Sequence, residues 1–520
     1  MKKITLFLIL SFLTLKTNSQ MIDSLGYVSN FEKDVFQKND SLKINASYFE
    51  LLFAIDSSYN LEKSKAIKGK VDNFIKSLDL KKVDRLSKRK KIKYVFNKVH
   101  KSFLNKYQDV INFSKIFEDG TYNCVTASAI YSYVFDNLKI PYQIKETPTH
   151  IFLVAYPNDS NIYIETTIPG NKGFYSPSDK DIEKAVSELI KGKLITKIYV
   201  EQVGYKKAYM DFFYDKEYLK PIELVGVQYY NEGVTHFQNE KYEKAYYSFK
   251  KAEKFYNTKK VKYLKISCLS LLLTKSNFNQ IKDIKNITTL INSLKYQKDY
   301  LKKDLGYYIS NIIIANENNE KFLISAADEF KNVQNQEVKN ILTNDLFKYI
   351  AKRRFRLDKN LENILEYALK VYEYKKDDED IQNLISNAIL KYYFYITPNK
   401  NSVQRIEEYS IEYPFLKKSR FYKKYMIRVY SYMTNQYYYK KEPEVGALYF
   451  DRLKSLIKES KSNIELDQEL IGNAYWAIGA YYYGKSKLKK AKEILEEGIK
   501  ISPEHHKLNK ILSYVNEDLK

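Results

Sequence analysis

Three side chains that can act together in acyl transfer occur in order along one stretch of the chain: Cys124, His150 and Glu165. A thiol becomes an effective nucleophile when it ionises, and an imidazole within hydrogen-bond reach promotes this by taking the proton. A carboxylate on the second ring nitrogen orients the imidazole. The sequence therefore predicts a catalytic set in which Cys124 is the nucleophile, His150 the base and Glu165 the orienting acid.

Cys124 stands where a helix is expected to begin. Residues 119–123 are rich in turn-forming side chains, and the apolar run 124–138 predicts one helix that ends before Pro141. The N–H groups of a first helical turn favour a nearby negative charge by about 0.3 to 1 kcal/mol. Because this is too little to ionise a thiol at neutral pH, the mechanism also requires His150 as a partner.

Three short segments rich in β-branched and aromatic residues follow this helix and are predicted to be strands: 142–146, 150–156 and 161–167. The turn-forming residues 157–160 predict an antiparallel hairpin between the last two. A register that pairs residue 150 with residue 165 is compatible with this turn and would place His150 beside Glu165. We therefore expect an α+β unit that ends near residue 200.

This stretch resembles the transglutaminase-like fold of papain-type cysteine enzymes. The likeness rests on four motifs: GTYNCVTASA at 120–129, NLKIP at 137–141, THIFLV at 149–154 and YIETT at 163–167. In that family a helix begins with the nucleophilic cysteine, and a histidine and an acidic residue lie on successive strands. The resemblance implies attack by Cys124 on an amide, a thioester intermediate and release to water or to an amine.

The sequence departs from the family pattern at three positions. Glu165 stands where an aspartate is usual, Phe152 where a tryptophan is common, and Lys139 where a glycine often precedes the Ile-Pro step. These departures keep a second interpretation open, in which the domain has the fold without catalysis. The protein would then be a non-catalytic scaffold that binds other proteins.

The chain changes character at about residue 222, where strand signals vanish and helical segments alternate with short polar breaks. Two stretches match the small, aromatic and terminating positions of the 34-residue tetratricopeptide motif. The matching residues are Gly233, Tyr242, Ala245, Phe249 and Ala252 in the first, and Tyr475, Ile478, Gly479, Tyr482, Leu488, Ala491, Leu495 and Pro503 in the second. The region resembles an all-α solenoid of degenerate tetratricopeptide-like repeats, with a generic helical bundle as the alternative. Such an array implies a peptide or protein partner.

The first twenty residues have the pattern of a secretory signal peptide: two lysines, an apolar run over 4–15, and small polar residues up to Gln20. We therefore expect an exported protein, periplasmic or secreted, with no transmembrane span in the mature chain; an uncleaved anchor is the alternative. The expected organisation is a signal peptide at 1–20, a transglutaminase-like α+β domain at 21–205 with its core at about 90–170, and a helical repeat domain at 222–520.

The composition fits this organisation. Only 15 Gly and 10 Pro occur in 520 residues, which disfavours long all-β folds, and 44% of the residues are hydrophobic, enough for a sizeable core. The net charge of +24 comes mostly from lysines that are spread along the chain, as on solvated helix faces. We therefore expect no nucleic-acid partner.

The remaining cysteine and the histidines suggest no further chemistry. Cys268 lies in an apolar helical run, so we expect a buried core residue rather than a disulfide partner of Cys124, although that pairing stays open. The five histidines include the adjacent pair His505 and His506, which we expect to lie in an exposed tail. None has the spacing of metal ligands, and no nucleotide-binding motif is present, so no metal or cofactor is expected.

Overall fold

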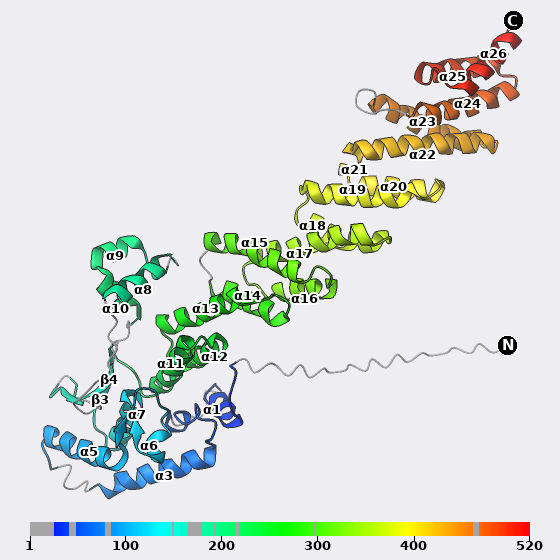
Figure 1. Cartoon of the computed structure of the whole chain (residues 1–520). Coiled ribbons are helices and arrows are strands. Elements are labelled where there is room, and N and C mark those ends of the chain that lie inside the picture. Colours follow the sequence, from blue (N-terminus) through cyan, green and yellow to red (C-terminus); the bar gives the residue numbers. More distant parts are fainter. Residues whose placement is uncertain are drawn as a thin grey trace, which may run out of the picture. The chain divides into compact units, whose positions relative to one another are not determined.

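The computed structural model of the chain describes residues 25–40, 48–78, 85–147, 150–157, 159–164, 179–191, 194–213, 218–294, 298–460 and 467–520. These residues are mostly helical, as the sequence predicted, with one small antiparallel sheet and one short parallel pair of strands (Figure 1). The chain forms two compact units, Met1–Ser276 and Asn277–Lys520. The predicted signal peptide lies outside the described residues.

The first unit begins with helices that surround the later elements: α1 (Asn30–Asp40), α2 (Tyr48–Leu51), α3 (Leu61–Ser77) and α5 (Lys88–Phe103). Two short parallel strands follow, β1 (Lys106–Tyr107) and β2 (Thr121–Tyr122), with helix α6 (Lys115–Glu118) between them. Gly120, directly before β2, has a φ of 76°, a conformation that glycine adopts without strain. Strand β2 follows this turn and leads directly into Asn123 and Cys124.

Helix α7 (Cys124–Asn137) is the central element of the first unit, and all its residues from Val125 to Phe135 are buried. Asn123 caps its N-terminus: the Asn123 side chain accepts a hydrogen bond from the Thr126 amide, and the Thr126 hydroxyl accepts one from the Asn123 amide, each at 2.9 Å. Reciprocal caps of this kind fix where a helix starts. The prediction of a helix that begins with Cys124 is confirmed.

An antiparallel sheet packs beside α7 in the order β3 (Tyr142–Thr147), β4 (His150–Ala155) and β5 (Ile162–Ile164). Ile144, Leu153 and Ile164 lie side by side across it and are buried in the core that surrounds α7. The predicted antiparallel hairpin between β4 and β5 is confirmed.

The register suggested for this hairpin is wrong. Leu153 pairs with Ile164 and Ala155 with Ile162, which is two residues away from the register that would pair 150 with 165. The cause is the turn, in which the Asn161 amide bonds to the Tyr156 carbonyl at 3.1 Å. Tyr156 and Asn161 both adopt positive φ, so the turn is centred one residue later than the pairing of 150 with 165 requires.

Three further helices, α8 (Asp179–Lys191), α9 (Lys197–Val203) and α10 (Tyr205–Phe213), pack around a small separate apolar cluster. The next three are α11 (Glu223–Gln238), α12 (Tyr242–Phe255) and α13 (Lys259–Thr274). Buried residues of α11, α12 and α13 belong to the same core as α7. The first compact unit therefore extends to Ser276, beyond the change of sequence character near residue 222.

Two buried ion pairs, which we call the junction pairs, join α12 and α13 to the earlier part of the unit. Glu32 of α1 lies 2.8 Å from the Lys251 ammonium, and Glu146 of β3 lies 2.7 Å from the Lys260 ammonium. The two lysine side chains are only 3% and 2% exposed, so the expectation that lysines lie on solvated faces is wrong for both.

Each junction pair includes a tyrosine. The Tyr229 hydroxyl donates to Glu32 at 2.7 Å, and the Tyr256 hydroxyl donates to Glu146. The Lys251 ammonium also lies 5.5 Å from the centre of the Tyr229 ring. These additional contacts satisfy charges that would otherwise be costly to bury.

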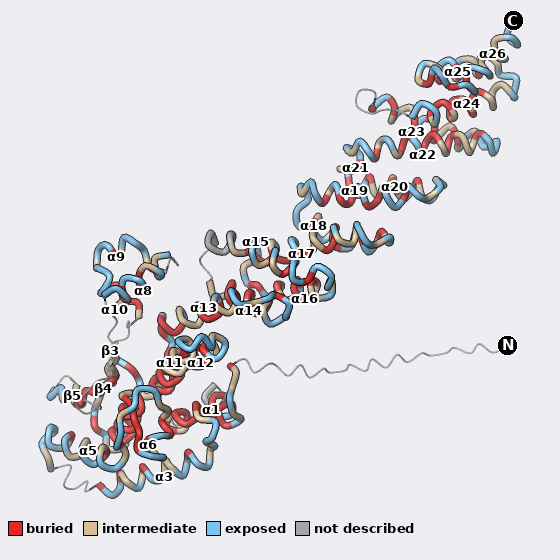
Figure 2. The backbone as a smooth tube through the Cα atoms, in the orientation of Figure 1, coloured by how far each residue is buried: buried red, intermediate tan, exposed pale blue. Residues whose placement is uncertain are grey.

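The second unit is helical throughout its described residues. Its helices are α14 (Ile281–Ser293), α15 (Lys298–Ala315), α16 (Glu320–Phe330), α17 (Gln336–Leu357), α18 (Leu361–Tyr374), α19 (Glu379–Phe394), α20 (Lys400–Glu412), α21 (Phe415–Lys418), α22 (Arg420–Tyr439), α23 (Pro443–Ser460), α24 (Gln468–Gly484), α25 (Leu488–Ile501) and α26 (His506–Asp518). Figure 2 shows buried residues along the faces where successive helices meet. Among the described helices, none combines the length and apolar character needed to cross a membrane.

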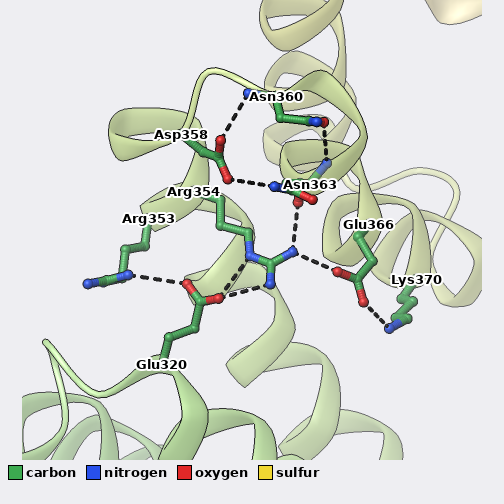
Figure 3. Close-up of polar contacts among 8 residues, drawn as sticks. All are labelled: Glu320, Arg353, Arg354, Asp358, Asn360, Asn363, Glu366 and Lys370. Carbon is green, nitrogen blue, oxygen red and sulfur yellow. Dashed lines mark hydrogen bonds and ion pairs between the residues drawn. The ribbon is translucent and has the colours of Figure 1, made fainter.

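An arginine network joins three successive helices of the second unit (Figure 3). Arg354 of α17 bonds to Glu320 of α16 at 3.0 Å and to Glu366 of α18 at 2.7 Å. Arg353 bonds to the second oxygen of Glu320 at 3.2 Å, and Lys370 pairs with Glu366 at 3.1 Å. The planar guanidinium of Arg354 can therefore hold two carboxylates from different helices at once.

Candidate functional site

Cys124 is half-buried at the first position of α7 and packs against the core of the first unit. Tyr107 of β1 lies close to it: burial, together with the nearby Cys124 and Asp109, raises the pKa of Tyr107 above its usual value. The thiol therefore lies between a capped helix start and a phenol that stays neutral at physiological pH. The sequence placed Cys124 correctly at this helix start.

His150 is the first residue of β4. Its ring stacks on that of Phe152 with 5.9 Å between centroids, and both ring nitrogens are shielded from solvent. Side chains alternate along a strand, so His150 and Phe152 share one face of the sheet, while Ile151 and Leu153 point into the core around α7. The alternation alone directs the imidazole to the face opposite that core.

One contact nevertheless joins the chain segments that carry the two residues. The Ser128 hydroxyl, one turn after Cys124, lies 3.4 Å from the carbonyl oxygen of Ile151, which is adjacent to His150. The structure therefore brings the first turns of α7 and the start of β4 to one corner of the unit. Within that corner, Tyr107 lies near the Cys124 thiol, and the His150 ring stacks on that of Phe152.

Glu165, the third predicted residue, lies outside the described residues, because the described part of β5 ends at Ile164. The corrected register of β4 and β5 removes the argument that paired it with His150.

Asn123 has a structural role. Its side-chain oxygen caps α7, and its side-chain nitrogen donates to the Asp109 carbonyl at 3.1 Å. Both ends of the amide are thus used to hold the turn before Cys124.

Cys268 lies in α13, is completely buried, and its pKa is raised to about 12 by burial. Neither cysteine forms a disulfide within the described residues, and the prediction of a core role for Cys268 is confirmed. The prediction that the histidine pair lies in an exposed tail is wrong for His505. His505 is only 4% exposed and its Nδ1 accepts from the Leu508 amide, so it caps α26 rather than lying in an exposed tail.

A polar cleft of about 330 Å³ adjoins Asn123 and α11, and sequence reasoning missed it. Amide side chains line much of it, including Asn112 and Asn231, and two titratable residues of α11, Glu232 and His236, lie on its wall. Burial raises the pKa of Glu232, against an opposing hydrogen bond from Ser248. Burial and two neighbouring lysines lower the pKa of His236. The sequence signal that could have revealed Glu232 and His236 was their spacing of four residues on a predicted helix, which places them on the same helix face.

Within the described residues, no three His, Cys, Asp or Glu side chains gather in a way that could hold a metal ion. Comparison with models of known protein families gives no match, and comparison with curated proteins gives none either.

Proposed function

We propose that the first unit is a transglutaminase-like domain that transfers or hydrolyses an acyl group of a peptide or protein, with Cys124 as nucleophile and His150 as base. The observation that carries this proposal is the contact between Ser128 and the Ile151 carbonyl, because it holds the first turns of α7 beside the start of β4. The tetratricopeptide-like array predicted over 222–520, which includes the whole second unit, holds the substrate protein. In this proposal the chain is exported, and the orienting role of Glu165 rests on the family resemblance alone, since the register does not pair it with His150.

The chemistry follows from these positions. The Cys124 sulfur attacks the carbonyl carbon of an amide as His150 takes the thiol proton. The backbone N–H of Cys124 donates to the oxyanion that forms. His150 then gives its proton to the departing amine, and a thioester remains on Cys124. Water or an amine attacks that thioester, His150 takes its proton, and the thiol is restored.

The cleft beside Asn123 supports a peptide as the substrate. The amide side chains of Gln108, Asn112 and Asn231 on its wall can pair with backbone N–H and C=O groups, which gives affinity without requiring a particular side chain. Asn123, the residue before Cys124, lines this cleft, so a peptide bound there would lie near the start of α7.

Alkylation of the full chain by iodoacetamide at pH 6.5, followed by intact mass and peptide mapping, tests the proposal. We expect Cys124 to react at least about tenfold faster than glutathione, as an activated thiolate does. His150→Ala should remove this acceleration, whereas His100→Ala, which alters another half-buried histidine of the same unit, should preserve it. Cys268 serves as the internal control and should stay unlabelled because it is buried.

The non-catalytic scaffold remains the second candidate, and the strand alternation at His150 favours it. If the imidazole lies beyond hydrogen-bond reach of the thiol, it takes no proton from Cys124. Cys124 would then react at the rate of an ordinary thiol, with the same rate in His150→Ala. That result would reject catalysis while leaving the fold in place.

A further inference from the structure

The second unit carries an apolar groove of about 480 Å³ between α17, α19 and α22. We use the name aromatic groove for the surface formed by Phe355, Lys391, Phe394, Tyr395, Phe421, Lys424 and Arg428. Three of its rings are far more exposed than aromatic side chains usually are: Phe394 is 51% exposed, Phe421 72% and Tyr395 81%. Large apolar side chains that gather on a surface mark a site for a partner.

The cations of the aromatic groove rest on rings. The Arg428 guanidinium lies 4.7 Å from the centre of the Phe394 ring, and the Lys391 ammonium lies 5.0 Å from that of Phe355. Within the described part of the chain, neither these two cations nor Lys424 forms an ion pair with a carboxylate. The rings hold the cations in place, and their charge remains available to a ligand.

Several cations of α17 that lie outside the groove are paired. Lys348 of α17 lies 3.0 Å from Asp378, and Arg354 bonds to two carboxylates. The carboxylate that does reach the groove, Asp467, accepts from the Leu470 amide at 3.1 Å and caps α24. The aromatic groove therefore combines apolar surface with an excess of positive charge.

We infer that the aromatic groove docks a protein segment in which an aromatic or aliphatic side chain is flanked by aspartate or glutamate. The apolar side chain would cover the exposed rings, and burial contributes about 25 cal/mol for each Å² removed from water. The flanking carboxylates would pair with Arg428 and the two lysines through charge-assisted hydrogen bonds. This inference rests on the part of the proposed function that gives the second unit a peptide or protein partner, and it is independent of Cys124.

A single-stranded nucleic acid also combines stacking with negative charge, but the surroundings favour the peptide. Binding of that kind follows a continuous basic track. Here Asp467 lies at the groove, and Asp378 and Asp380 occupy the N-terminal turn of α19. Asp378 and Asp380 pair with Lys348 and so interrupt a basic track along α19, whereas a short peptide needs cations only at the groove.

Selection of a random peptide display library on the full chain tests the inference. We expect enriched peptides to share an apolar residue between acidic ones. The affinity of a synthetic enriched peptide, measured by fluorescence polarisation, should fall at least about tenfold in Arg428→Glu and in Phe394→Ala. Lys490→Glu is the matched control, because Lys490 lies 4.5 Å from the Tyr482 ring but outside the groove, and it should bind as the parent does.

Several outcomes would overturn the inference: no enrichment, enriched peptides without acidic residues, or affinities unchanged in Arg428→Glu and Phe394→Ala. Displacement of the peptide by a single-stranded oligonucleotide or by phosphatidylglycerol vesicles, with tighter binding to either, would reassign the groove. Self-association that these variants abolish would assign it to a second copy of the chain. Because the variants lie in the second unit, Cys124 alkylation should be unaffected, which separates this test from that of the proposed chemistry.

Discussion

The junction pairs of the first unit and the arginine network of the second use the same kind of interaction in different surroundings. Glu32 and Lys251 are 0% and 3% exposed, whereas Arg354 and Glu366 are 16% and 45% exposed. A buried charge that loses its partner cannot recover its hydration, but a half-exposed one is rehydrated by water. Burial therefore decides which ion pairs the fold depends on.

The largest effect is expected at the junction pair of α1 and α12. Glu32→Ala leaves the Lys251 ammonium and the Tyr229 hydroxyl without their acceptor in the core, so it should destabilise the first unit by about 3 to 5 kcal/mol. Urea denaturation combined with hydrogen exchange in α12 would measure this loss.

A double variant sharpens this prediction. Glu32→Leu with Lys251→Met replaces the pair by apolar side chains, and it should recover most of the loss because no buried charge remains. A double variant as unstable as Glu32→Ala would show that packing at α1, rather than an unpaired charge, is responsible.

A smaller effect is expected in the arginine network. Arg354→Ala breaks contacts among α16, α17 and α18, and it should destabilise the second unit by about 1 to 2 kcal/mol. Raising NaCl to about 1 M should shrink this difference by screening, while leaving the effect of Glu32→Ala almost unchanged. The comparison fails if the two variants respond equally to salt in urea denaturation.

The smallest effect is expected at Glu232, which lies between these extremes of burial. Its pKa is raised in the folded protein, so the folded state binds its proton more tightly than the unfolded state. Stability from this group is present at low pH and is lost as the pH rises through the folded pKa. Glu232→Gln should therefore be more stable than the parent at pH 7, by up to about 1 kcal/mol, and equal to it near pH 4. Thermal melts over this pH range would check the sign.

The sequence predicted local features well where one dominant signal was present. Turn residues before an apolar run placed the start of α7 at Cys124, because a side-chain cap needs only neighbouring residues. The order of helix and three strands followed from composition in the same way. Gly479 packs closely against the Leu495 side chain, where a Cβ atom would collide with it.

Features that depend on distant parts of the chain were not predictable. Lys251 and Lys260 look like any solvated lysine until Glu32 and Glu146 are placed beside them. The register of β4 and β5 depended on one residue of turn geometry, which composition does not specify. The candidate site had the same difficulty: neighbouring sequence placed Cys124, but the direction of the His150 side chain depends on how the strand meets α7.

The bond between Tyr229 and Glu32 spans 197 residues of sequence. Contacts between residues this far apart in sequence raise the contact order of the fold. Closing such a long loop costs conformational entropy before the stabilising packing contacts can form. Helix α1 therefore stays incompletely buried during synthesis until Tyr229 and Lys251 have been added to the chain. The part of the chain before α11 and helices α11, α12 and α13 share one core within one compact unit. A deletion that separates them would remove part of that core.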